Sequence, residues 1–221
     1  MWICCFCQYR VSDHLFYITP FFYIIQERNI HRSITHLEQK EIRQAFIQSA
    51  IHVVAQQGLV KATTKAIAAA AGLNEAYIYK CFRGKDELLA AALWELDDGL
   101  RRQLHETFPR IMYNETLTWK ERCFLLWRSS WEFILEKEDE CLFYLRYYYS
   151  ADFRLYAREK HLEYYRAMTS RIGYIFRPGT DIDLITHQIF ETMLFFAAHV
   201  MAGDMKNDET TTERTFAQIY S

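Results

Sequence analysis

The side chains that could do chemistry are concentrated between Lys40 and Leu93, where basic groups outnumber acidic ones. Seven Lys and Arg residues stand against four Asp and Glu residues there, so this segment carries a formal charge of +3. The whole chain carries −2, which leaves −5 for the remainder. A basic segment on an acidic body is typical of a protein that contacts a polyanion with one part only.

The elements that position these groups begin with two helices. Apolar residues recur at three- and four-residue steps from Glu41 onward, which predicts an amphipathic helix. Gly58 is expected to end that helix in a left-handed conformation. Thr63 is expected to cap a short second helix running to Ala71, and Gly72 is expected to end it.

Asn74 is the expected cap of a third short helix, in which Ile78 and Phe82 belong to the core. A long fourth helix is predicted from Lys85, and Pro109 is expected to stop it. Two short helices joined by a Gly-containing turn form a helix-turn-helix motif. The second helix of such a motif can enter the major groove of DNA, which is ~12 Å wide.

The rest of the chain also has a helical pattern. Thr118 with Glu121 predicts a capping box, one long helix is expected from about residue 152 to 176, and Pro178 marks a break before an apolar helix. Thr210 with Glu213 is expected to open a short last helix. The sequence has no strand-like run of period two, and it has only 7 Gly and 3 Pro residues. The predicted fold class is therefore all-α.

The segment TTKAIAAAAGLNEAYIYKCFRGKDELLAAAL, residues 63–93, resembles the DNA-binding domain of the TetR/AcrR family of transcriptional repressors. The matching positions are Thr63-Thr64, Ile67-Ala68, Ala71-Gly72, Tyr79, Phe82 and Lys85. The resemblance covers about residues 40–93 and is architectural beyond them. It implies a three-helix DNA-binding domain at residues 39–85 and a larger helical effector-binding and dimerisation domain at residues 86–221.

The resemblance also implies which side chains contact double-stranded operator DNA. Phosphate contacts are expected from the side chains of residues 64, 79, 80 and 85, and base contacts from residues 74–77. Glu75 could accept a hydrogen bond from a cytosine amino group, and Ala76 could touch a thymine methyl group. The alternative that Tyr77 is core and Glu75 only solvated stays open. The complete expected set is Thr63, Thr64, Asn74, Glu75, Ala76, Tyr77, Tyr79, Lys80 and Lys85.

For the larger domain the family implies dimerisation, because two recognition helices ~34 Å apart read two half-sites. The helix after Pro178 is the expected interface, through Ile185, Ile189, Met193 and Phe196. The alternative is a helix buried within one chain.

A pocket for a small hydrophobic or aromatic effector is also implied. Aromatic and weakly polar residues are candidates for its lining, although residues at helical spacing are also ordinary core. They are Trp127, Trp131, Phe143, Tyr147, Tyr148, Tyr164, Tyr165 and His199.

We therefore expect a cytoplasmic, ligand-responsive DNA-binding repressor that is a homodimer. The alternative is a structural DNA-associated or protein-interaction module of the same fold without an inducer. No enzyme motif, cofactor, metal site or membrane segment is expected. The Cys4/Cys7 pair and the His31/His36 and His187/His199 pairs are expected to be ordinary thiols and histidines. Residues 1–38 are either an extension or a segment upstream of the working start, near residues 35–40.

Overall fold

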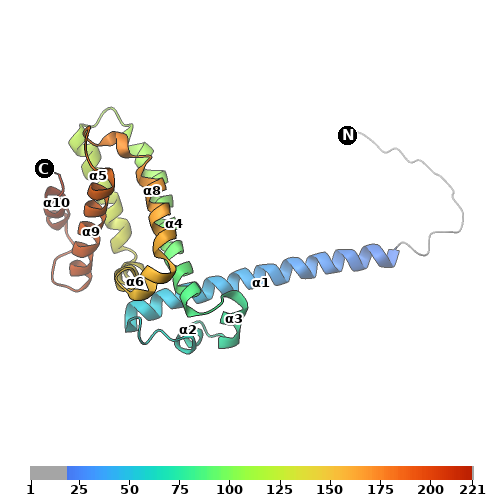
Figure 1. The fold of residues 1–221 in the computed structure, drawn as a ribbon. Coiled ribbons are helices and arrows are strands. Elements are labelled where there is room, and N and C mark those ends of the chain that lie inside the picture. The colour runs from blue at the N-terminus through green and yellow to red at the C-terminus, as the bar shows by residue number, and fades with distance from the viewer. Residues whose placement is uncertain (1–18, 221) are drawn as a thin grey trace, which may run out of the picture. The chain divides into compact units, whose positions relative to one another are not determined.

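The computed structural model describes the backbone of residues 19–220 and the side chains of residues 38–220. All regular elements within these residues are helical, which confirms the all-α prediction (Figure 1). The helices are α1 (Thr19–Gln57), α2 (Thr64–Ala70), α3 (Ile78–Cys81), α4 (Lys85–Met112), α5 (Trp119–Leu135), α6 (Glu138–Tyr148), α7 (Ala151–Tyr156), α8 (Arg158–Thr169), α9 (Ile182–Met201) and α10 (Glu209–Ala217), with short 3-10 turns η1 (Glu75–Tyr77) and η2 (Gly173–Ile175).

Helix α1 begins at Thr19, well before the predicted start at Glu41. Pro20 lies in its first turn, where a missing N–H group costs no helical hydrogen bond. The residues up to Ile42 form a unit of their own, and the compact unit that contains all the other helices begins at Arg43. An amphipathic period reports a face buried against a core, so the sequence pattern marked the start of the compact unit rather than the start of the helix.

The short helices after α1 are bounded by the residues that the sequence predicted. The Thr63 hydroxyl accepts a hydrogen bond from the Ala66 N–H at 3.1 Å, and the Asn74 side chain accepts one from the Ala76 N–H at 2.9 Å. Gly58 and Gly72 have φ values of +81° and +65°, in the left-handed region that glycine tolerates best. These four local predictions are confirmed.

The prediction that Pro109 stops the fourth helix is wrong. Helix α4 continues through Pro109 to Met112, and the Tyr113 N–H still donates to the Pro109 carbonyl at 3.2 Å. A proline lacks the hydrogen bond of its own nitrogen and its ring crowds the preceding turn, but its carbonyl can still accept a bond from the turn that follows.

The single helix expected from about residue 152 to 176 is also wrong, because the chain breaks at Ala157, whose φ is −126°. The break separates α7 from α8, and the chain after Thr169 continues into η2. Residues eight apart in a straight helix lie ~12 Å apart along its axis. The rings of Phe153 and His161 are eight residues apart, and their centroids lie only 5.6 Å apart. The break allows both rings to enter one aromatic cluster.

The last helix begins slightly earlier than predicted. Asp208 caps α10 by accepting a hydrogen bond from the Thr211 N–H at 2.9 Å, so Thr210 lies inside the helix and does not open it. Asp is among the strongest N-caps and outcompetes a threonine two residues later. The capping box of Thr118 and Glu121 at the start of α5 is confirmed.

Candidate nucleic-acid interface and ligand cavity

The segment of η1 and α3 has one face in the core and another at the surface. Ile78 and Phe82 are buried, with 0% and 3% of their surface exposed, and Phe82 lies under the guanidinium of Arg43 at 4.8 Å. Tyr77 and Tyr79 are 39% and 60% exposed. The core positions expected from the sequence are therefore core, and both tyrosines lie at the surface.

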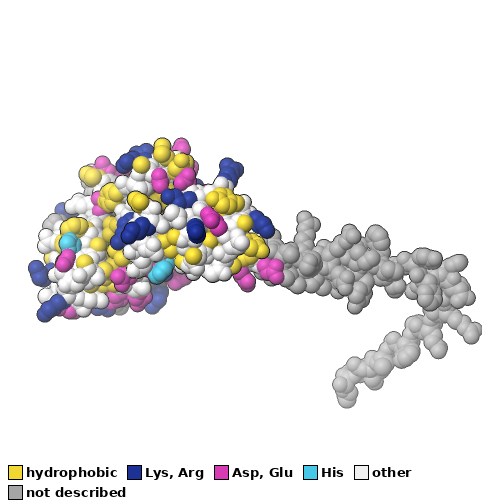
Figure 2. Space-filling model, turned by 90° about the horizontal axis from the view of Figure 1, so that it is seen from below, with side chains coloured by type: hydrophobic (Ala, Val, Ile, Leu, Met, Phe, Trp, Pro, Cys, Tyr) yellow, Lys and Arg dark blue, Asp and Glu magenta, His cyan; other side chains and the backbone are white. Residues whose placement is uncertain are grey.

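The expected DNA-contacting residues fall into two groups by exposure. Those that are half-buried are Thr64, Glu75 and Lys85, and those that are exposed are Thr63, Asn74, Ala76, Tyr77, Tyr79 and Lys80. The ammonium of Lys80 lies 4.5 Å from the centroid of the Tyr77 ring, a distance typical of a cation–π contact. Figure 2 looks at the side of the molecule on which α2 and α3 lie, and Lys and Arg side chains are spread over it among hydrophobic and neutral ones.

Two of the residues that are expected to contact DNA form a hydrogen bond with each other. The Thr64 hydroxyl donates a hydrogen bond to the Glu75 carboxylate at 2.5 Å, and this bond joins the first residue of α2 to the first residue of η1. The Thr64 hydroxyl proton is therefore already used, and the hydroxyl oxygen faces a carboxylate. Sequence reasoning assigned each residue its own contact and missed this pairing.

Helix α6 holds the end of α1 in place. The guanidinium of Arg146 donates to the Val54 carbonyl at 2.7 Å and also to the Ala55 carbonyl. At the other end of α6, the Asp139 carboxylate binds His52 at 2.6 Å and Gln56 at 2.7 Å. Helix α6 is thus fixed to the end of α1 by side chains at both of its ends.

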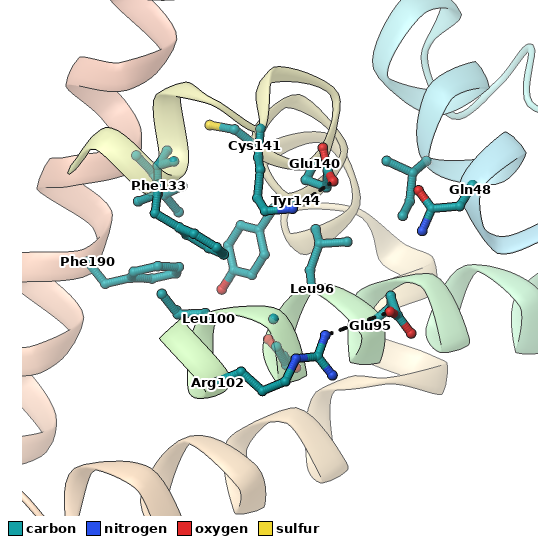
Figure 3. A pocket seen from close by; sticks show the side chains of 16 residues that line it. Gln48, Glu95, Leu96, Leu100, Arg102, Phe133, Glu140, Cys141, Tyr144 and Phe190 are labelled. Atoms are coloured by element: carbon teal, nitrogen blue, oxygen red, sulfur yellow. Dashed lines mark hydrogen bonds and ion pairs between the residues drawn. The ribbon is translucent and has the colours of Figure 1, made fainter. Parts of the chain in front are cut away.

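A partly open cavity of about 130 Å³ lies between α1, α4, α5, α6 and α9 (Figure 3). In Figure 3 the rings of Phe133, Tyr144 and Phe190 lie close to one another on one side, and Glu95 and Arg102 lie on α4 on the other. The lining residues are Gln48, Ile51, Glu95, Leu96, Asp97, Gly99, Leu100, Arg102, Phe133, Ile134, Lys137, Glu140, Cys141, Tyr144, Phe190 and Leu194.

Asp97, His161 and Tyr144 form a buried polar chain at this cavity. The Nδ1 atom of His161 lies 2.9 Å from the Asp97 carboxylate, and its Nε2 atom lies 3.4 Å from the Tyr144 hydroxyl. The side chains of His161 and Asp97 are only 5% and 10% exposed. Burial raises the pKa of Asp97 above its ordinary value, and the hydrogen bond and charge of His161 oppose that rise. Sequence reasoning missed Asp97 and His161, which are 64 residues apart.

Most of the residues expected to line an effector pocket lie in the packed core. Trp127, Trp131, Phe143, Tyr147 and Tyr165 are at most 7% exposed. The indole rings of the two tryptophans stack at 6.4 Å, and the rings of Phe143 and Tyr147 stack at 5.5 Å.

The other three expected pocket residues lie elsewhere. The hydroxyl of Tyr164 donates to the Asp97 carbonyl at 3.3 Å. Tyr148 and His199 line a second cavity, of about 310 Å³, which shares Tyr144 and Leu194 with the first. The polar chain at Asp97 and these two cavities, rather than the stacked aromatic pairs, are therefore the candidate ligand sites.

Helix α9 presents apolar side chains to solvent. Leu184 is 67% exposed and Phe195 is 57% exposed, whereas Met193 is buried at 4%. Ile185, Ile189 and Phe196 are half-buried. By length and composition alone, α9 is long and apolar enough to cross a membrane. Within its most apolar 18 residues, 22% are buried in the protein. Core helices of ordinary folded proteins have the same length and composition, so this is weak evidence for a membrane span.

The cysteines and histidines form no metal site in the part of the chain that the structure describes. His199 binds the Asp204 carboxylate at 3.0 Å, and His187 contacts the Asp183 carbonyl at 2.7 Å. Burial raises the pKa of the Cys141 thiol to about 12, which keeps it protonated and unreactive. Cys4 and Cys7 and the side chains of His31 and His36 lie outside the described residues.

Comparison with known proteins gives a family match for the segment that contains α2, η1 and α3. Residues 46–92 match the family model described as bacterial regulatory proteins, tetR family. The HTH-type nicotine-responsive transcriptional repressor HdnoR of Paenarthrobacter nicotinovorans is 37% identical over 70 residues, 32% of this chain and 34% of that protein. The match thus spans about a third of that relative's length.

Solved structures extend the likeness to the fold of most of the chain. A TetR family transcription regulator from Marinobacter aquaeolei VT8 has a TM-score of 0.68 at 16% identity, over 84% of this chain and 96% of that one. The transcriptional regulator FadR from Bacillus subtilis, in complex with stearoyl-CoA, has a TM-score of 0.61 at 19% identity, over 80% and 97% of the two chains. At these identities the likeness concerns the fold alone.

Proposed function

Since this chain belongs to the TetR family of bacterial regulators through the DNA-binding domain at residues 46–92, we propose that it is a sequence-specific repressor in the cytoplasm. It binds a palindromic operator as a homodimer and leaves it when a small effector binds. Residues 39–85 carry the DNA contacts, and residues 86–221 carry dimerisation and effector binding. The family is one of regulators and not of enzymes.

The observation that carries this proposal is the pair of exposed tyrosines at the end of η1 and in α3, next to residues that are buried in the core. Ile78 and Phe82 fix the helix on its core, so Tyr77, Tyr79 and Lys80 are held at the surface instead of collapsing inward. Phenol and ammonium groups bind phosphate oxygens and so set the register of the recognition helix on DNA. Asn74 and Ala76, which are also exposed, are placed to reach base edges.

The test is fluorescence anisotropy of the purified full chain on its own upstream DNA at fixed salt, with scrambled DNA as the comparison. We expect binding at least ~1000-fold tighter to the upstream DNA. Tyr79→Ala and Lys85→Ala should weaken it. The matched controls are Tyr113→Ala, which removes another exposed tyrosine, and Lys120→Ala, which removes a lysine from the first turn of α5. Equal, weak binding to both DNAs would argue against a specific repressor of its own promoter.

Dimerisation through α9 is supported by its exposed apolar side chains. Of the residues predicted from the sequence, Ile185, Ile189 and Phe196 are partly accessible to a partner, whereas Met193 is already used by the core. Leu184 and Phe195 add accessible apolar surface. Sedimentation of the wild type and of Phe195→Glu tests this, and a monomeric wild type would contradict it.

An effector is supported by the two cavities, each of which has room for a small molecule. The relative HdnoR is described as nicotine-responsive, and FadR was solved with stearoyl-CoA. These two ligands differ in size and charge, so the family resemblance leaves the chemical class of the effector open. The alternative function, a DNA-associated module without an inducer, predicts that no small molecule changes DNA affinity.

A further inference from the structure

The charges on the wall of the 130 Å³ cavity do not balance. Three carboxylates, those of Glu95, Asp97 and Glu140, line it together with two cations, Arg102 and Lys137. Glu95 lies 3.9 Å from Arg102, and Glu140 lies 3.4 Å from Lys137. Asp97 is therefore the one lining carboxylate without a permanently charged partner among the described residues, since His161 is charged only when protonated.

The environment of Asp97 strengthens its attraction for a cation. Its side chain is only 10% exposed, so water screens it weakly, and a positive charge placed nearby interacts more strongly than it would at the surface. The rings of Phe133, Tyr144 and Phe190 line the same cavity. Aromatic faces attract cations, and the attraction is stronger when the cation is shielded from water.

The size of the cavity limits what it accepts. A cavity of about 150 Å³ in another protein holds one benzene molecule, and this one measures about 130 Å³. A single ring with a short charged arm matches that volume.

We propose that this cavity binds a compact organic cation, a protonated amine carrying one ring, with Asp97 as its counter-ion and Phe133, Tyr144 and Phe190 as its walls. This inference rests on the proposed repressor function and names its effector class. The ammonium group takes the place of His161 as the hydrogen-bond partner of the Asp97 carboxylate. Because Asp97 is on α4 and His161 is on α8, the exchange loosens α4 from α8.

The test uses benzylamine, benzyl alcohol and benzoate as a cationic, a neutral and an anionic probe of one ring each. Calorimetry or ligand-observed NMR on the full chain should give binding in the order benzylamine, benzyl alcohol, benzoate. Asp97→Asn should weaken benzylamine about 30-fold or more and leave benzyl alcohol almost unchanged. The matched control is Glu106→Gln, which removes an exposed carboxylate from the same helix outside the cavity.

Phe190→Leu provides a second variant in case Asp97→Asn does not fold. It should weaken benzylamine by a few fold through loss of an aromatic face and should affect benzyl alcohol less. Equal affinity for benzylamine and benzoate, no benzylamine binding, or the same benzylamine affinity in folded Asp97→Asn would overturn the proposal.

DNA binding is measured separately, so the two proposals can fail independently. A chain that binds benzylamine through Asp97 but binds no operator supports this inference and contradicts the repressor function. A chain that binds its operator tightly and ignores benzylamine keeps the repressor function and overturns this inference.

Discussion

The proposed DNA-binding segment and the proposed ligand cavity differ in how their interacting groups are connected along the chain. In residues 63–85 the key hydrogen bonds join residues two, three or eleven positions apart, such as Asn74 to Ala76 and Thr64 to Glu75. At the cavity, Asp97 and His161 are 64 positions apart. The first region depends on local backbone conformation, and the second depends on how whole helices pack.

The two regions also treat their polar groups differently. Near the surface, Tyr79 and Lys80 keep their polar atoms in water, where a ligand can replace the water at small cost. At the cavity, His161 and Asp97 have lost most of their water and depend on each other. Removing one buried partner therefore costs stability, whereas removing an exposed side chain costs binding alone.

The largest expected contrast comes from substituting Tyr79, which is in α3, and Phe82, which directly follows that helix. Phe82→Ala should lower the free energy of unfolding by about 3 to 5 kcal/mol, because it empties a buried ring site. Tyr79→Ala should change it by less than about 0.5 kcal/mol while weakening DNA binding. Urea unfolding and anisotropy of both variants check this. A destabilised Tyr79→Ala with normal DNA affinity would reverse the assignment.

The next largest effect is expected at the cavity. His161→Ala should lower the free energy of unfolding by about 3 kcal/mol, because the Asp97 carboxylate is left buried without its partner. The exposed His52, which binds Asp139, is the matched control, and His52→Ala should cost less than about 1 kcal/mol. Equal losses in the two variants would show that burial does not set the strength of these pairs.

A smaller effect is expected at the cap of α2. Thr63→Ala should lower the free energy of unfolding by about 1 kcal/mol, since the Ala66 N–H loses its acceptor. Thr63→Ser keeps the hydroxyl and should restore most of that loss. Thermal unfolding of the two variants is the measurement, and equal melting temperatures would contradict a capping role.

The smallest expected effects are on the pH dependence of stability. Asp97 and Glu121 should change it in opposite directions. Burial raises the folded pKa of Asp97, so its contribution to stability is present at low pH and is lost as pH rises through that pKa. The Thr118 hydrogen bonds lower the folded pKa of Glu121, so its contribution is present above the ordinary Glu pKa and is lost as pH falls.

Unfolding free energies from pH 3 to 7 should separate these two groups. Asp97→Asn should remove a contribution to the free energy of unfolding that decreases as pH rises. Glu121→Gln should remove a contribution that increases as pH rises. Slopes that change in the same direction for both variants would contradict the assigned environments.

The regions also differ in what could be predicted from the sequence. Caps and left-handed glycines such as Thr63, Asn74, Gly58 and Gly72 were predicted because each acts on residues within one helical turn. The family resemblance is confirmed because a local motif carries it, and the all-α fold class is confirmed because helical patterning extends along most of the chain.

Features that depend on distant packing were not predicted. The break at Ala157 brings Phe153 and His161 into one cluster, and no local pattern in the sequence reports that contact. The aromatic residues expected at a pocket are largely core, because a ring at helical spacing has the same pattern whether it faces a cavity or another ring. The buried pair of Asp97 and His161 left no sequence signal that single-helix periodicity could detect.

The continuity of α4 has a mechanical consequence. Asp97 lies twelve residues after Lys85 on the same helix, a lever arm of ~18 Å at 1.5 Å per residue. A tilt of ~3° about Asp97 would then move the start of the helix by ~0.9 Å. Hydrogen bonds to phosphate oxygens occupy a distance range of only ~0.5 Å. On the proposed function, a ligand no larger than one ring would therefore detach Lys85 from a DNA phosphate without any helix unfolding.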